Sequence, residues 1–251
     1  MFRKTLFIVS ILILMNASYS VAAEVEDFFV LANDAYRQGD YAQAIKGYTE
    51  ITNEGFESSS VYFNLGNAYT KDDNLGRAIL SYERALWIDP RDADINANYK
   101  YVLSQAQVNR SGSDENMLLK SIDGHIKFYS INEMFIISCL SSFCIFVVGL
   151  IGGSFLRVKS TRMLLLIGSI LVSTVFVSGL ILKINLFNQA AIVLNDVDGK
   201  YEPREEAVVH FQIREAERVD VVKVLNGWAK VRRKDGKLGW IEAQFVEKII
   251  L

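Results

Sequence analysis

Two histidines and two cysteines are the residues of this sequence best suited to acid–base, metal or thiol chemistry. His125 and His210 lie in different segments, and neither has a cysteine, a serine motif or an acidic cluster at a recognisable spacing. Cys139 and Cys144 are five residues apart in an apolar stretch, where a helix would point them in different directions. Glycine-rich phosphate loops and the common hydrolase and zinc-protease motifs do not occur in the sequence. The sequence therefore predicts no enzyme, no metal site and no cofactor.

The charge composition limits the classes of partner. Twenty-seven Lys and Arg residues stand against 29 Asp and Glu residues, and the net charge of −2 argues against nucleic acid, which needs a basic face. The charges are unevenly distributed. In residues 134–182 the only charged side chains are those of Arg157, Lys159 and Arg162. A soluble fold would not expose so long an apolar stretch. The stretch is therefore expected to form membrane helices, which would position the rest of the chain.

The first 23 residues have the order of a secretory signal peptide. Arg3 and Lys4 precede an apolar run of ten residues, and small residues follow up to Ala22 and Ala23. The run is short for a membrane span, although an uncleaved N-terminal anchor remains the alternative. In either case the residues after Ala23 are expected outside the cytoplasm.

Residues 24–107 repeat with a period of 34, which is the tetratricopeptide period. Gly66 and Ala78 are small where two antiparallel helices would cross, and Pro90 would end the second helix. Asp92 can cap a further helix that covers the second repeat. Any amphipathic pair of helical hairpins is the alternative. The period aligns Phe28 with Tyr62, Leu31 with Leu65, Asn33 with Asn67, Ala44 with Ala78, Ile45 with Ile79 and Tyr48 with Tyr82.

The candidate partner-binding residues lie on the first helix of each repeat. Asn33 and Arg37 in the first copy correspond to Asn67 and Lys71 in the second, and the one-turn spacing places each pair on the concave face. Because these side chains are polar, their replacement is expected to change stability by no more than about 0.5 kcal/mol. The segment 24–107 holds fourteen acidic and seven basic residues, which indicates either a solvated surface or a face for a basic or extended peptide. Two repeats are few for a solenoid, so packing on a partner, a membrane or a second copy is expected.

Two charge-free stretches predict membrane spans. Residues 108–133 form a linker whose second half is either an interfacial helix or an ordinary loop. Residues 134–156 and 163–182 are each long enough to cross the hydrocarbon core. The loop 157–162 between them carries three basic residues and no acid, which places it in the cytoplasm and both soluble parts on the extracytoplasmic side. The spans hold no Asp, Glu, Lys, Arg or His, which argues against a transporter or proton channel.

From Ala190 onward the sequence changes to short β-rich runs separated by turns, and residues 183–251 are assigned to the C-terminal domain. Asn226-Gly227 and Asp235-Gly236 are typical of hairpin turns. The sequence order of these two turns followed by Gly239-Trp240 resembles that of bacterial SH3-like domains. Trp228 and Trp240 are expected either to pack the barrel or to line a ligand groove. Eleven basic and eleven acidic residues from 188 to 251 suggest no strongly charged partner for this domain.

The whole chain resembles the BatE-like proteins of bacterial aerotolerance operons. The resemblance lies in the order of signal peptide, repeats, two spans and SH3-like barrel, and in the step from Pro90 to Asn98. It implies an inner-membrane protein that acts beside von Willebrand factor A-type Bat proteins and a MoxR-type ATPase in envelope or oxidative stress. The fold class expected is a multi-domain membrane protein, with an all-α tetratricopeptide region, two transmembrane helices and a C-terminal all-β SH3-like barrel. The function expected is a scaffold for protein–protein interactions, and the alternative is cell-wall (peptidoglycan) binding by the barrel.

Overall fold

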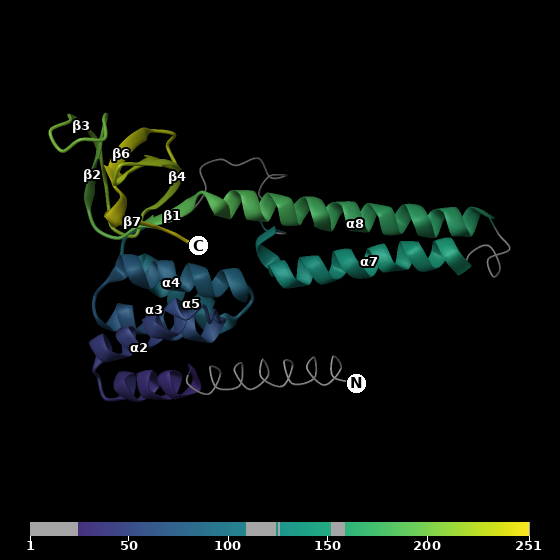
Figure 1. Ribbon diagram of the computed structural model, residues 1–251, viewed down its shortest axis with the longest axis horizontal. Coiled ribbons are helices and arrows are strands. Elements are labelled where there is room, and N and C mark those ends of the chain that lie inside the picture. Colours follow the sequence, from purple (N-terminus) through teal and green to yellow (C-terminus); the bar gives the residue numbers. More distant parts are fainter. Residues whose placement is uncertain (1–24, 109–123, 125, 152–158, 251) are drawn as a thin grey trace, which may run out of the picture.

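The structure is a computed structural model that describes residues 25–108, 124, 126–151 and 159–250. It contains a stack of short helices, two long helices and a β-barrel (Figure 1). The predicted signal peptide, most of the predicted linker, His125 and the end of the first predicted span lie outside the described residues, as does Arg157.

Five helices form the helical region. Their spacing follows the sequence repeat, because α3 and α5 begin at Ser59 and Ala93, and α2 and α4 begin at Tyr41 and Leu75, in each case 34 residues apart. The side chains of the N-cap residues accept hydrogen bonds from backbone N–H groups in the first turn of α2 to α5. The helices are residues 25–37, α2 (Tyr41–Asn53), α3 (Ser59–Lys71), α4 (Leu75–Ile88) and α5 (Ala93–Gln105).

Small residues allow these helices to pack closely. A Cβ atom on Gly66 would lie 2.9 Å from the ring of Tyr82, and one on Gly47 would lie 2.8 Å from the Cβ of Ala32. Ala78 is fully buried on α4. The two helices of the second repeat, α3 and α4, are therefore in close contact at Gly66 and Ala78, as these small residues predicted. α5 begins in the register of the first helix of a third repeat.

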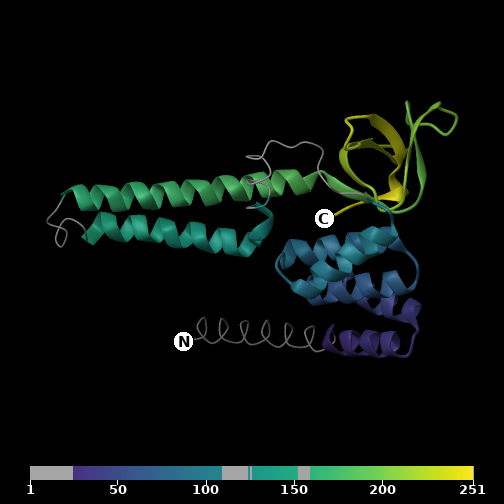
Figure 2. The same ribbon diagram turned by 180° about the vertical axis from the view of Figure 1, so that it is seen from behind.

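The two long helices, α7 (Ile131–Ile151) and α8 (Lys159–Asn188), lie side by side and antiparallel (Figure 1 and Figure 2). Within the described ranges, one segment is long and apolar enough to cross a membrane, namely Met163–Asn188 with a mean hydropathy of 2.4. None of its most apolar window is buried, which distinguishes it from a core helix. The described apolar part of α7, Ile131–Val147, is shorter than a span requires.

The C-terminal region is a seven-stranded antiparallel sheet in the order β3-β2-β6-β5-β4-β1-β7. Asn226 and Gly227 have φ angles of 50° and 81°, as the predicted hairpin turn between β4 and β5 requires. The sequence patterns did not predict β2 or β7, and β2 is unusual because it contains Asp198 and Gly199. Gly199 is needed there, since a Cβ atom would lie 2.7 Å from the ring of Phe211. The strands are β1 (Ala190–Val193), β2 (Val197–Lys200), β3 (Val209–Ile213), β4 (Arg218–Leu225), β5 (Trp228–Arg232), β6 (Leu238–Glu242) and β7 (Val246–Lys248).

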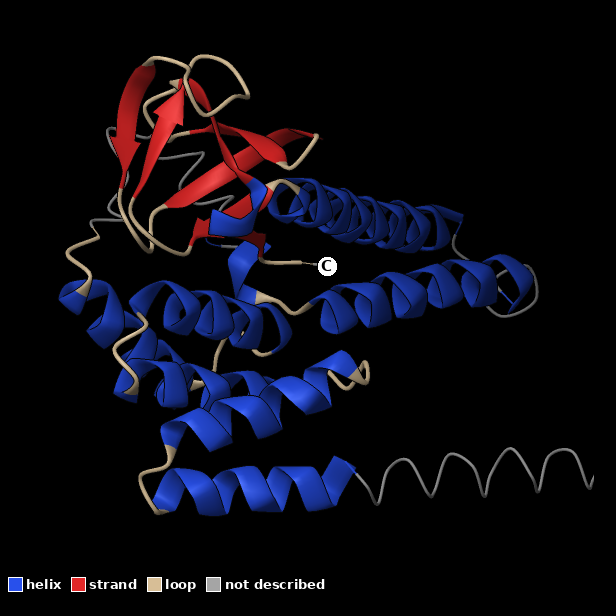
Figure 3. Ribbon diagram, turned by 60° about the vertical axis from the view of Figure 1, so that its left-hand side comes forward, coloured by secondary structure: helices blue, strands red, loops and turns tan. Residues whose placement is uncertain are grey.

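Strand β1 joins the barrel to the helical region because both of its faces are buried. Ala191 and Val193 belong to the core of the barrel, whereas Ala190 and Ile192 belong to the core of the helical region. α4 approaches the end of this strand closely, since a Cβ atom on Gly76 would lie 2.9 Å from the carbonyl oxygen of Leu194. The barrel therefore rests on the helical stack (Figure 3), and the two predicted domains share one apolar cluster.

Candidate functional site

Asn33, the first candidate partner-binding residue, holds three helices together. Its Oδ1 accepts a hydrogen bond of 2.6 Å from the hydroxyl of Tyr48 on α2 and one of 3.0 Å from Nδ2 of Asn64 on α3. Tyr48 is buried, while both asparagines are half-buried. The side-chain oxygen of Asn33 thus accepts hydrogen bonds from within the protein. It links the two helices of the first repeat to the first helix of the second repeat.

Asn67 makes the same contacts one repeat period later. Its Oδ1 accepts hydrogen bonds of 2.7 Å from the hydroxyl of Tyr82 on α4 and 2.8 Å from Nδ2 of Asn98 on α5. Burial raises the pKa of Tyr82 to about 12, so its hydroxyl stays protonated and able to donate well above neutral pH. We call these two triads the asparagine ladder, which consists of Asn33, Tyr48, Asn64, Asn67, Tyr82 and Asn98.

Arg37 and Lys71, the other two candidates, are exposed. Arg37 pairs with Asp34 on its own helix, and its side chain is 73% exposed. Lys71 is the last residue of α3 and is also exposed. The structure therefore joins Asn33 and Asn67 through the ladder and leaves the two basic residues at the ends of their helices.

Exposed apolar side chains extend the ladder at both ends. Val30 stands one repeat period before Asn64, and Tyr101 stands one period after Asn67; their exposed fractions are 46% and 58%. Among the residues that the structure describes, no hydrogen bond uses Nδ2 of Asn33 or of Asn67. The ladder face, formed by helix 25–37, α3 and α5, thus offers amide N–H donors between apolar groups, which suits an extended polypeptide.

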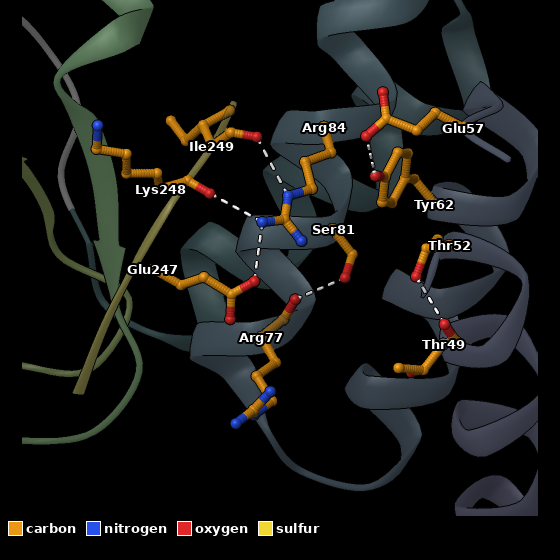
Figure 4. Close-up of polar contacts among 10 residues, drawn as sticks. All are labelled: Thr49, Thr52, Glu57, Tyr62, Arg77, Ser81, Arg84, Glu247, Lys248 and Ile249. Atoms are coloured by element: carbon orange, nitrogen blue, oxygen red, sulfur yellow. Dashed lines mark hydrogen bonds and ion pairs between the residues drawn. The ribbon is translucent and has the colours of Figure 1, made fainter. Parts of the chain in front are cut away.

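The opposite side of the helical region is covered by the barrel. The side chain of Arg84 on α4 is 12% exposed, and its Nη2 donates to Oε1 of Glu247 at 2.8 Å and to the carbonyl oxygen of Lys248 at 2.9 Å. Its Nε donates to the carbonyl oxygen of Ile249 at 3.1 Å (Figure 4). Arg84 therefore supplies hydrogen-bond donors to the outer edge of β7 and to the carbonyl oxygen of the residue after it.

A buried carboxylate strengthens this contact. The side chain of Glu83 is 5% exposed; it accepts a hydrogen bond of 2.5 Å from the hydroxyl of Tyr99 and one of 3.3 Å from Nη1 of Arg218 on β4. Burial raises the pKa of Tyr99, which keeps that hydroxyl protonated as the donor. Glu83 thus links α4, α5 and the barrel.

The helical region also contacts the base of the two long helices. Lys183 of α8 is buried; its Nζ donates to the carbonyl oxygen of Tyr129 and lies 5.1 Å from the ring centroid of Trp87 on α4. Arg91, in the loop after α4, pairs with Glu133 near the start of α7. These contacts set the helical region at a defined position beside α7 and α8, and none of them involves a residue of the asparagine ladder.

The described histidine packs against aromatic rings, whereas the two cysteines lie at the surface of α7. His210 stacks on Tyr201 with ring centroids 4.2 Å apart and lies 5.1 Å from the ring of Phe211. Cys139 and Cys144 are exposed free thiols on α7. In the described ranges, no group of three or more His, Cys, Asp or Glu residues could hold a metal ion.

The two tryptophans of the barrel are half-buried on the outside of the sheet and are not part of the barrel core. The ammonium of Lys200 lies 5.3 Å from the ring centroid of Trp228, and that of Lys230 lies 5.8 Å from the ring centroid of Trp240. No sequence pattern marks these lysines as special, because their position beside the indole rings depends on strand register.

A comparison with protein families supports the assignment of the barrel. Residues 201–248 match the family described as "Bacterial SH3 domain". No curated protein matches the chain. The predicted SH3-like character of the C-terminal region is thus confirmed, and the part of the chain from the loop after β2 through β7 is similar to bacterial SH3 domains.

Proposed function

We propose that the protein is a membrane-anchored scaffold whose ladder face binds an extended segment of a partner protein on the extracytoplasmic side of the membrane. The observation that carries this proposal is the division of the helical surface. Arg84 and Glu83 hold the barrel against the α4 side, whereas the ladder face remains accessible and combines amide donors with exposed Val30 and Tyr101. The regular spacing of the helix starts supports the assignment of residues 24–107 to tetratricopeptide repeats.

The proposed anchor is a pair of spans in a bacterial inner membrane. α8 supplies a segment long enough to cross the hydrocarbon core. We assign residues 134–156 to the first span and the basic loop 157–162 to the cytoplasm. This topology places the helical region and the barrel on the same outer side, in agreement with their shared apolar cluster.

The proposed partners follow from the sequence resemblance. A BatE-like aerotolerance-operon protein would act beside von Willebrand factor A-type Bat proteins and a MoxR-type ATPase. A two-repeat face is short, so the partner segment would also contact neighbouring surfaces or a second copy of the chain.

Site-specific photocrosslinking in membranes tests the scaffold proposal. A photoreactive residue at Tyr101, on the ladder face, is expected to crosslink an epitope-tagged von Willebrand factor A-type partner. The matched control is Lys46, which is exposed on α2 and lies away from the ladder. Equal crosslinking from both positions, or a complex that forms without any crosslink from Tyr101, would contradict binding at the ladder face.

A second candidate function is cell-wall binding by the barrel, favoured by the family match at residues 201–248. The test is co-sedimentation of the full chain, in a neutral detergent, with purified peptidoglycan sacculi. Retention in the supernatant at all protein concentrations would contradict this second function and leave the scaffold proposal unaffected.

A further inference from the structure

Strand register places three lysines and a tryptophan in one row across four strands of the barrel. Lys223 of β4 lies opposite Lys230 of β5, and Lys230 lies opposite Trp240 of β6. Trp240 in turn lies opposite Lys200 of β2. Residues directly opposite in antiparallel strands point to the same face of the sheet. We call these four residues the lysine row.

The lysine row lies on the outer face of the barrel. Ala229 and Val231, on either side of Lys230, are buried in the barrel core, so the alternation of the strand turns Lys230 outward. Beside Trp240, Gly239 faces inward, where a Cβ atom would lie 2.8 Å from the ring of Phe211. The row is therefore accessible to a ligand.

The like charges in the row destabilise the folded barrel, so folding by itself does not explain their arrangement. Lys223 and Lys230 are directly opposite, and like charges at such positions destabilise an antiparallel pair. Among the described residues, Lys223, Lys230 and Lys200 form no ion pair. The indole rings near Lys200 and Lys230 offset part of the repulsion, and Nζ of Lys200 also donates to the carbonyl oxygen of Glu205.

Two acidic residues lie in the neighbouring rows, and in the described ranges neither forms an ion pair with a lysine of the row. In the row on one side Asp220 lies opposite Arg232, and in the row on the other side Glu242 lies opposite Trp228. The carboxylate of Glu242 also accepts a hydrogen bond from Nε2 of Gln244. The cationic row is thus a local concentration of charge in a domain whose total charge is balanced.

We propose that the lysine row is a binding site for an anionic glycan. This inference rests on the second proposed function, the envelope-binding role of the barrel, and assigns its site and ligand chemistry. Adjacent strands are about 4.8 Å apart, so the row presents several ammonium groups in a line and favours a chain with repeated anionic groups. The half-buried ring of Trp240 lies between Lys230 and Lys200, where the C–H face of a sugar can pack on it.

Titration of the full chain in neutral detergent tests this site, with polygalacturonate as the anionic glycan. The variant is the double substitution Lys223→Gln and Lys230→Gln. The control, Lys237→Gln with Lys248→Gln, removes the same charge from exposed positions of the barrel outside the row. Each lysine near an anionic surface contributes roughly fivefold to binding, so the row variant should bind about 25-fold more weakly and the control should change little.

Thermal unfolding provides a readout that a purely structural role would not give. Because the row variant loses opposed like charges, its melting temperature without glycan should equal or exceed that of the unmodified protein. Equal losses of affinity in both double variants would overturn the site, as would a lowered melting temperature without selective loss of binding. Equally tight binding of poly-L-glutamate, which carries carboxylates but no sugar rings, would overturn the glycan assignment. Co-sedimentation with sacculi but no binding of polygalacturonate would overturn this inference and leave wall binding in place.

Discussion

Replacement of Asn67 by alanine tests whether the asparagine ladder stabilises the helical region. The substitution removes the acceptor of two hydrogen bonds, from the hydroxyl of Tyr82 at 2.7 Å and from Nδ2 of Asn98 at 2.8 Å. Tyr82 is 1% exposed, and its other neighbour, Oγ1 of Thr70, is 3.4 Å away, so the hydroxyl would lose its close acceptor. Asn98 is half-buried and can turn to water.

The expected loss of stability for Asn67→Ala is about 2 kcal/mol, since a buried donor without an acceptor costs about 1–3 kcal/mol. Lys71→Ala is the matched control on the same helix, and its effect should stay within about 0.5 kcal/mol because Lys71 is exposed. The sequence alone predicted that both polar side chains could be removed with little loss of stability, whereas the hydrogen bonds of Asn67 predict a loss at that position.

Urea unfolding of the full chain in detergent, followed by helical circular dichroism, measures both variants. A double-mutant cycle with Tyr82→Phe isolates the hydroxyl, and Asn67→Ala should cost less in the Tyr82→Phe background. Hydrogen exchange should rise first in α3 and α5, which the Asn67–Asn98 bond joins. If Asn67→Ala and Lys71→Ala were equally stable, the ladder would have no structural role.

Further predictions concern topology, packing, docking and pH. Reporter fusions after Gln107 should be active outside the cytoplasm and those within 157–162 inside; the reverse pattern would exclude the two-span topology. Ala78→Leu should overpack the α3–α4 crossing and lower the unfolding free energy by about 1–3 kcal/mol, and an unchanged urea midpoint would show spare room there. Arg84→Met should remove three hydrogen bonds to the end of the barrel and increase hydrogen exchange in β7, whereas unchanged exchange would show that the apolar contact suffices. The pKa of Tyr82 is about 12 in the folded state against an ordinary 10.0, so the unfolded chain loses this proton first and stability should fall as pH rises from about 10 to 12. Tyr82→Phe should reduce that fall, measured as the urea midpoint against pH, and an unaltered slope would assign it to other groups.

Much of the helical and barrel architecture could be predicted from sequence because its signals are local. The repeat period, the cap at Asp92 and the hairpin turn at Asn226-Gly227 each depend on residues close together in the chain. β2 was missed, since its Asp198 and Gly199 have low strand propensity and the strand exists because Gly199 accommodates the ring of Phe211. Tertiary packing overrode local preference at that position.

Sequence alone determined which residues of the helical region are equivalent, and it placed Asn33, Arg37, Asn67 and Lys71 on the first helices of the repeats. The structure decided what these residues do, because the donors to Asn67 come from α4 and α5. Periodicity shows which face a side chain occupies but does not show which atoms meet across helices.

The same limit holds for the barrel and its docking on α4. The composition of residues 188–251, with eleven charges of each sign, indicated no charged surface. The β4–β5 hairpin aligned Lys223 with Lys230, strand pairing brought the distant Lys200 into the same row, and burial on both faces of β1 joined the barrel to the helical core. Register and docking are set by pairing between distant segments, and a shift of one residue would turn every side chain of a strand to the other face. Local sequence therefore determined the elements, while long-range pairing decided which charges and apolar groups became neighbours.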